Sequence, residues 1–110
     1  MHRDHVPDVP PSFYLLGSTP QCLVHGLALP YQLASPSQKL KFSPPNIHVL
    51  TLQGHPEFTP SIVSHIIDTR EKTGAMNAEV VKEGRERAGR KNDGVDVIGR
   101  VVWEIFGVGI

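Results

Sequence analysis

The sequence predicts an α/β fold in which strands are flanked by helices, and three stretches of the chain indicate it. Residues 47–52 form an apolar, partly β-branched run of strand length, which predicts a buried strand, and Gly54 and Pro56 then end it. Residues 60–73 and 95–106 instead repeat apolar residues at helical spacing. Because the apolar face of a helix needs a sheet to cover, these elements are expected to pack in layers.

Two further strands are expected earlier in the chain. Residues 13–17 and 22–29 are rich in apolar residues and are separated by the polar turn at residues 18–21, which predicts a hairpin. Residues 1–12 are polar and proline-rich, so a loop begins the chain. Residues 30–46 combine prolines, serines and lysines, which predicts a long mobile loop before the run at 47–52.

The helices have recognisable ends. Thr59 is a suitable N-cap and Pro60 a suitable first residue, so a helix is expected from there to Gly74. A second helix, at about residues 75–91, is charged almost all round. Because the signs of its charges alternate, it predicts a solvent-exposed helix and no binding patch.

Charge pairs support this second helix. Glu83 and Arg87, and likewise Glu86 and Arg90, are four residues apart, which is the spacing at which helical side chains meet. For residues 95–106 an amphipathic helix fits best, although the β-branched residues there leave a β-strand as the alternative.

Composition limits the classes of function. A chain of 110 residues fits one small domain, and its 11 basic and 11 acidic residues cancel, which disfavours nucleic acid and membrane surfaces as partners. Its one cysteine excludes an internal disulfide framework and fits a reducing compartment. The chain shows neither a signal peptide nor an apolar run of about 18 residues, so we expect a cytosolic protein.

Residues 54–57, Gly-His-Pro-Glu, carry the most informative chemistry in the chain. Turn formation accounts for Gly54 and Pro56, but it does not require His55 or Glu57. An imidazole and a carboxylate on one turn can be directed into a common cleft, where the carboxylate orients the imidazole and stabilises its charged form. They would supply two of the three members of a Cys-His-Glu triad.

The stretch that ends at residues 54–57 resembles the class I glutamine amidotransferases, in which a strand is followed by a G-H-P-E signature. The resemblance implies that residues 1–110 are the C-terminal part of a three-layer, flavodoxin-like domain, with residues 30–46 as an enlarged insertion loop. It further implies that His55 and Glu57 are catalytic, that the substrate is glutamine or another small γ-glutamyl amide, and that no cofactor is needed.

The first residues also match this family. His2, Asp4 and Val6 fit an H-x-D-x-V stretch, and the resemblance implies that the backbone around His2 helps to hold the substrate. The same region offers an alternative, because His2, Asp4 and His5 are all metal-ligand types. A hydrated loop beside prolines gives them no rigid frame, so we expect no metal site.

The nucleophile is the missing member of the triad. In the family it is a cysteine in a G-x-C-x-G turn, which this sequence lacks. Cys22 is the remaining candidate, but it lies on a predicted hairpin strand without flanking glycines, so we expect a small, half-buried apolar role for it. The resemblance implies that the front half of the domain is absent, through a truncated gene model, an internal start or a split gene.

Three functions remain open. The complete protein would hydrolyse glutamine or a γ-glutamyl amide, with this chain alone inactive. Alternatively, the chain is a non-catalytic interaction module, or it is one half of a split enzyme whose other half is its partner. Self-association is expected where apolar helix faces lack their sheet. The histidines outside the two family motifs, His25, His48 and His65, are expected to lie too far along other elements to replace His55.

Overall fold

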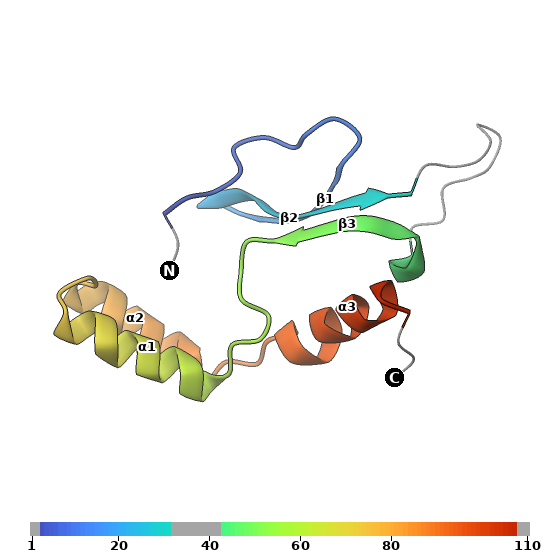
Figure 1. The fold of residues 1–110 in the computed structure, drawn as a ribbon. Helices are drawn as coiled ribbons and strands as arrows, with labels where there is room; N and C mark the ends of the chain where they lie inside the picture. Colours follow the sequence, from blue (N-terminus) through green and yellow to red (C-terminus); the bar gives the residue numbers. More distant parts are fainter. Residues whose placement is uncertain (1–2, 32–42, 108–110) are drawn as a thin grey trace. The chain divides into compact units, whose positions relative to one another are not determined.

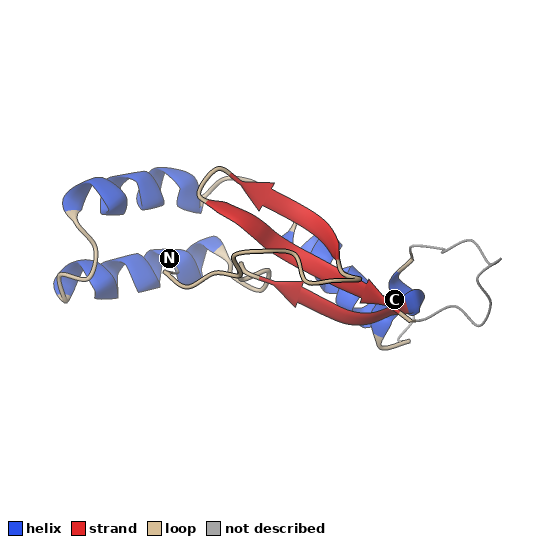
Figure 2. Cartoon of the chain, turned by 90° about the horizontal axis from the view of Figure 1, so that it is seen from above, coloured by secondary structure: helices blue, strands red, loops and turns tan. Residues whose placement is uncertain are grey.

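The computed structural model describes residues 3–31 and 43–107, and the chain divides into two compact units (Figure 1). One unit comprises residues 1–55 and 100–110, and the other comprises residues 56–99. The first contains an antiparallel sheet of three strands in the order β1-β2-β3. The second contains a pair of helices, α1 and α2, which lie side by side (Figure 2). The chain is therefore a mixed α/β protein, as the sequence predicts.

The predicted hairpin and the strand after it are all present. The strands are β1 (Tyr14–Thr19), β2 (Cys22–Pro30) and β3 (Ile47–Leu52). Strand β2 pairs with both of its neighbours, and Leu27 lies opposite Leu15 on one side and Thr51 on the other. Because β2 is central, it supplies most of the buried side chains of the sheet: Cys22, Val24, Leu27 and Ala28.

The expectation of a buried strand at residues 47–52 is wrong for most of its length. Ile47 is buried, whereas Val49, Leu50 and Leu52 are half-buried. Strand β3 lies at an edge of the sheet formed by the described residues, so it has a hydrogen-bonded neighbour on one side only. The predicted loop at 30–46 is only partly described: Pro30 belongs to β2, residues 44–46 form the 3₁₀ turn η1 (Pro44–Asn46), and residues 32–42 lie outside the described residues.

Helix α1 (Pro60–Lys72) begins and ends where the sequence predicts. The Thr59 hydroxyl accepts a hydrogen bond from the backbone N–H of Ile62, and Pro60 occupies the first turn. Beyond the helix, Gly74 adopts a positive φ of 71°, a conformation that favours glycine. The cap and the glycine therefore fix the two ends of α1.

Helix α2 (Ala78–Ala88) is shorter than the predicted 75–91. The Asn77 side chain caps it by accepting a hydrogen bond from the N–H of Val80 at 2.9 Å, and Gly89 ends it. The predicted pair Glu83–Arg87 is present at 3.0 Å. Arg90 lies beyond the end of α2, so the helical spacing assumed for Glu86 and Arg90 does not apply.

Helices α1 and α2 meet through a small apolar contact and an ion-pair cluster. Ile67 and Val81 are buried, and a Cβ at Gly84 would lie 3.0 Å from Cδ1 of Ile67, so the missing side chain allows the close approach. Arg85 binds Asp68 at 2.8 Å and Glu71 at 2.7 Å, which joins the two helices. Its hydrogen bonds to Asp68 and then to Glu71 raise the pKa of the Arg85 guanidinium.

The predicted C-terminal helix has two parts. Residues Gly94–Gly99 form a π-helical segment, η2, and Arg100–Ile105 form α3, which packs against η1. In η2 the N–H of Ile98 donates to the carbonyl of Asp93, five residues back, at 3.0 Å. The prediction of a regular α-helix is therefore wrong for residues 95–99 and is confirmed only for the residues of α3.

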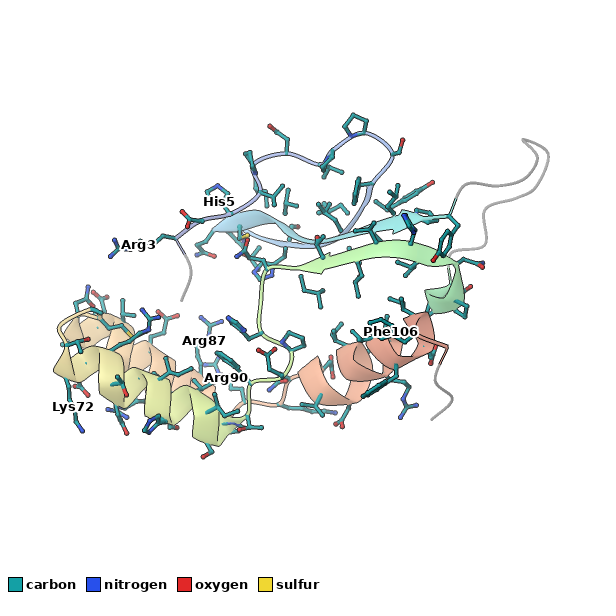
Figure 3. All side chains as sticks on the ribbon, in the orientation of Figure 1. Arg3, His5, Lys72, Arg87, Arg90 and Phe106 are labelled. Atoms are coloured by element: carbon teal, nitrogen blue, oxygen red, sulfur yellow. The ribbon has the colours of Figure 1, made fainter. Side chains whose placement is uncertain are left out.

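Large apolar side chains are exposed on both units, and in the second unit Val95 is 57% exposed. Leu23 is 66% exposed, Trp103 is 53% exposed, and Phe106, just beyond α3, is 72% exposed (Figure 3). On β1 the run Tyr14, Leu15 and Leu16 is also exposed. Among the described residues, no helix combines the length and the apolar character needed to cross a membrane.

Candidate functional site

The Gly-His-Pro-Glu corner, residues 54–57, lies between β3 and α1. Strand β3 ends at Leu52, and pairing with β2 extends one residue further because the N–H of Gln53 donates to the carbonyl of His25 at 2.9 Å. The chain then turns through the corner and reaches the Thr59 cap of α1. A strand end and a capped helix start therefore hold the two ends of this short segment.

His55 and Glu57 are both exposed. The boundary between the two units falls between them: His55 is the last residue of its segment of the first unit, and Glu57 lies in the second. An orienting contact between the His55 imidazole and the Glu57 carboxylate stays a prediction.

Pro56, in the middle of the corner, is packed against Gly94 within the second unit. A Cβ at Gly94 would collide with the Pro56 carbonyl oxygen and lie 2.9 Å from the Pro56 Cα. Gly94 itself is held by a hydrogen bond from its N–H to the Asn92 side-chain oxygen at 3.0 Å. Glycine is therefore required at position 94 by the close approach of the corner's backbone. The Asp93-Gly94 pair indicates a turn in the sequence, but no local pattern could connect it with Pro56.

His25 lies closer to the corner than we expected. A Cβ placed on Gly54 would lie 3.9 Å from Cε1 of the His25 imidazole, and both residues belong to the first unit. The expectation that His25 is remote from the corner is therefore wrong, because pairing between β2 and β3 brings them together. His48 lies on β3 with its ring centroid 4.8 Å from that of Tyr31, and His65 lies in α1.

Cys22 does not have the setting of a reactive thiol. It is 3% exposed at the start of β2, and its Sγ donates a hydrogen bond to the Val24 carbonyl at 3.4 Å. Its N–H donates to the hydroxyl of Thr19 at 3.1 Å, across the hairpin turn. Both the backbone and the thiol of Cys22 are therefore hydrogen-bonded. The apolar role expected from the sequence fits this position, and Cys22 is more deeply buried than predicted.

The N-terminal residues add little to the described site. His2 lies outside the described residues, so its predicted role near the substrate stays a prediction. Asp4 and His5 are exposed, and His5 extends from the N-terminal segment (Figure 3). Among the residues that the structure describes, no three His, Cys, Asp or Glu side chains are grouped closely enough to bind a metal ion.

The comparisons with known proteins give one informative match. A protein of Schizosaccharomyces pombe that is named as glutamine amidotransferase-like is 31% identical over 88 residues. Those residues make up 80% of this chain but only 29% of the yeast protein. No family model matches the sequence, and no solved structure gives a significant match. The match supports, at most, a relationship to the glutamine amidotransferase-like proteins.

Proposed function

We propose that this chain carries the His-Glu corner of a class I glutamine amidotransferase-like protein, which hydrolyses glutamine or another γ-glutamyl amide. One observation carries the proposal. A Gly-His-Pro-Glu sequence lies directly between the end of β3 and the cap of α1, in a chain of which 80% aligns with a glutamine amidotransferase-like protein. The single cysteine agrees with activity in a reducing compartment such as the cytosol.

The proposed chemistry assigns proton transfer to His55 and an orienting role to Glu57. A cysteine thiolate attacks the amide carbonyl, and His55 gives a proton to the departing ammonia. His55 then takes a proton from the water that releases the acyl group. Glu57 holds the imidazole in the useful tautomer and stabilises its charged form. The loop around His2 contributes contacts to the substrate.

The cysteine of this mechanism must come from residues outside the chain described here. Cys22 is buried, and its thiol already donates to a backbone carbonyl, so a substrate amide cannot reach it in this structure. Since the chain spans 29% of the length of its yeast relative, the proposal assigns the nucleophile and the oxyanion donors to the remaining part of such a protein.

The exposed apolar residues favour a second candidate. Leu23, Trp103 and Phe106 are each more than half exposed, and exposed apolar side chains are what a contact with another polypeptide would cover. A non-catalytic interaction module or one half of a split enzyme would both present such a surface. Activity in a reconstituted protein separates these two possibilities.

We predict that the isolated chain does not hydrolyse glutamine, because it has no accessible thiolate. Ammonia release should equal that of a buffer blank, and Cys22→Ala should change nothing. Native Cys22 should also resist a thiol reagent until denaturant is added, because the side chain is buried. Glutamine turnover by the pure chain that is lost in Cys22→Ala would contradict this prediction.

A chimera tests the proposed function itself. The segment of the yeast protein that matches this chain is replaced by residues 1–110, and ammonia release from glutamine is compared with that of the intact yeast protein and of the same protein lacking the segment. We expect the chimera to release ammonia and the deleted form to be inactive. A folded chimera without activity beside an active yeast protein, or an inactive yeast protein, would refute the proposal.

A further inference from the structure

We infer that His25 is a positioning residue for His55: it restrains the backbone at Gln53 and Gly54, the two residues that lead into the candidate proton carrier. The catalytic consequence rests on the proposed function, whereas the restraint itself can be measured without any substrate. The inference depends on one hydrogen bond to the backbone of His25 and on the position of the His25 ring beside Gly54.

The backbone contact extends the sheet beyond β3. The last partners in the ladder are Gly26 and Leu52, and the N–H of Gln53 then donates to the His25 carbonyl at 2.9 Å. Gln53 lies beyond the last residue of β3, so this hydrogen bond restrains a backbone position that the strand itself does not. The restraint thus reaches a point two residues before His55.

The His25 ring lies beside the next residue, Gly54. Gly54 has no side chain and is exposed, and glycine has access to more backbone conformations than any other residue. Within the described part of the chain, Cε1 of His25 is the one atom, chain neighbours excepted, within 4 Å of the position that a Cβ of Gly54 would take. Removing the imidazole would therefore leave this side of Gly54 open.

The position of the His55 imidazole depends on the backbone dihedrals of Gly54, the residue before it. A general acid-base must come within about 2.6–3.2 Å of the atom that it serves, and a displacement of about 1 Å can lower a rate on the order of 10²-fold. A strand residue that narrows the conformations of Gly54 therefore increases the fraction of molecules in which His55 is correctly placed.

Backbone ¹⁵N relaxation of the full chain tests the restraint. In the wild type we expect rigid order parameters of about 0.85 at Gly54 and His55, and in His25→Ala values below about 0.6. His25→Thr serves as a second variant in case His25→Ala does not fold, because threonine is suited to a strand. It should lower the order parameters at Gly54 and His55 by the same amount. His48→Ala removes an exposed imidazole from the neighbouring strand and should change neither value.

A second substitution distinguishes a restraint on Gly54 from general loosening of the sheet. Gly54→Ala adds a Cβ at an ordinary 3.9 Å from the His25 ring, so the wild-type background should tolerate it. In the His25→Thr background the added methyl group narrows the backbone conformations of residue 54, and order at His55 should return. Unchanged order parameters in folded His25→Thr, or no recovery on adding Gly54→Ala, would refute the inference.

The chimera supplies the catalytic readout. There His25→Thr should lower kcat on the order of 10²-fold with KM unchanged, and Gly54→Ala should restore part of the loss. A chimera that is active but insensitive to His25→Thr would contradict the positioning role. An inactive chimera would remove the proposed function, while the relaxation data would still decide whether His25 restrains the corner.

Discussion

His55→Ala in the chimera is expected to lower kcat for glutamine hydrolysis about 10²–10⁴-fold, the usual contribution of a general acid-base. The imidazole carries a proton twice in the proposed cycle, and the proposal gives Glu57 an orienting role instead of this one. His48 and His65 lie on β3 and α1, away from the corner in sequence. Steady-state ammonia release, with kcat and KM determined separately, measures the effect.

Two further variants provide the matched comparison. Glu57→Gln should lower kcat less than His55→Ala, because a neutral amide or water can partly replace an orienting carboxylate. His2→Ala should raise KM and leave kcat nearly unchanged if the N-terminal loop contacts the substrate. Equal losses in Glu57→Gln and His55→Ala would contradict the separate roles assigned to the two side chains.

Gly94→Ala is expected to give the largest loss of stability among conservative substitutions near the corner, about 1–3 kcal/mol in the free energy of unfolding. The added Cβ would meet the Pro56 carbonyl oxygen and lie 2.9 Å from its Cα. These are backbone atoms, which cannot move aside without displacing the corner. Urea denaturation measures the loss, and amide chemical shifts should change most at residues 55–58.

Gly99→Ala is the matched control for this substitution. Gly99 lies in η2 like Gly94, but apart from its chain neighbours and the helix backbone within four residues, the nearest atom to its added Cβ would be the Gly94 carbonyl oxygen at an ordinary 3.8 Å. Replacing glycine by alanine in a helical segment is otherwise favourable, so stability should stay the same or rise slightly. Equal unfolding free energies for the two variants would show that contact with Pro56 is not what position 94 requires.

Short-range signals predicted much of this fold. Thr59, Pro60 and Gly74 determine the two ends of α1 through a side-chain hydrogen bond, a fixed φ and a positive φ, all of which depend on neighbouring residues. The hairpin and β3 follow likewise from apolar runs separated by turn residues. His55 and Glu57 could be singled out because turn geometry does not explain their presence.

Contacts between distant residues could not be predicted in this way. Arg85 binds Asp68 and Glu71 on the other helix, so its partners are set by how α1 and α2 pack and not by helical spacing. His25 approaches Gly54 through the pairing of β2 with β3, and Gly94 approaches Pro56 from 38 positions further along the sequence (94 − 56 = 38). In each case the spacing of residues in the sequence contains no information about the contact.

The measurement that tests the central claim most directly is chemical rescue of the His55→Ala chimera by imidazole. The claim is that the Gly-His-Pro-Glu corner contributes a proton carrier, so a diffusible imidazole should partly replace the missing side chain. We predict that ammonia release rises with imidazole concentration in His55→Ala and stays constant in the parent chimera. A His55→Ala chimera with full kcat in the absence of imidazole would contradict the claim.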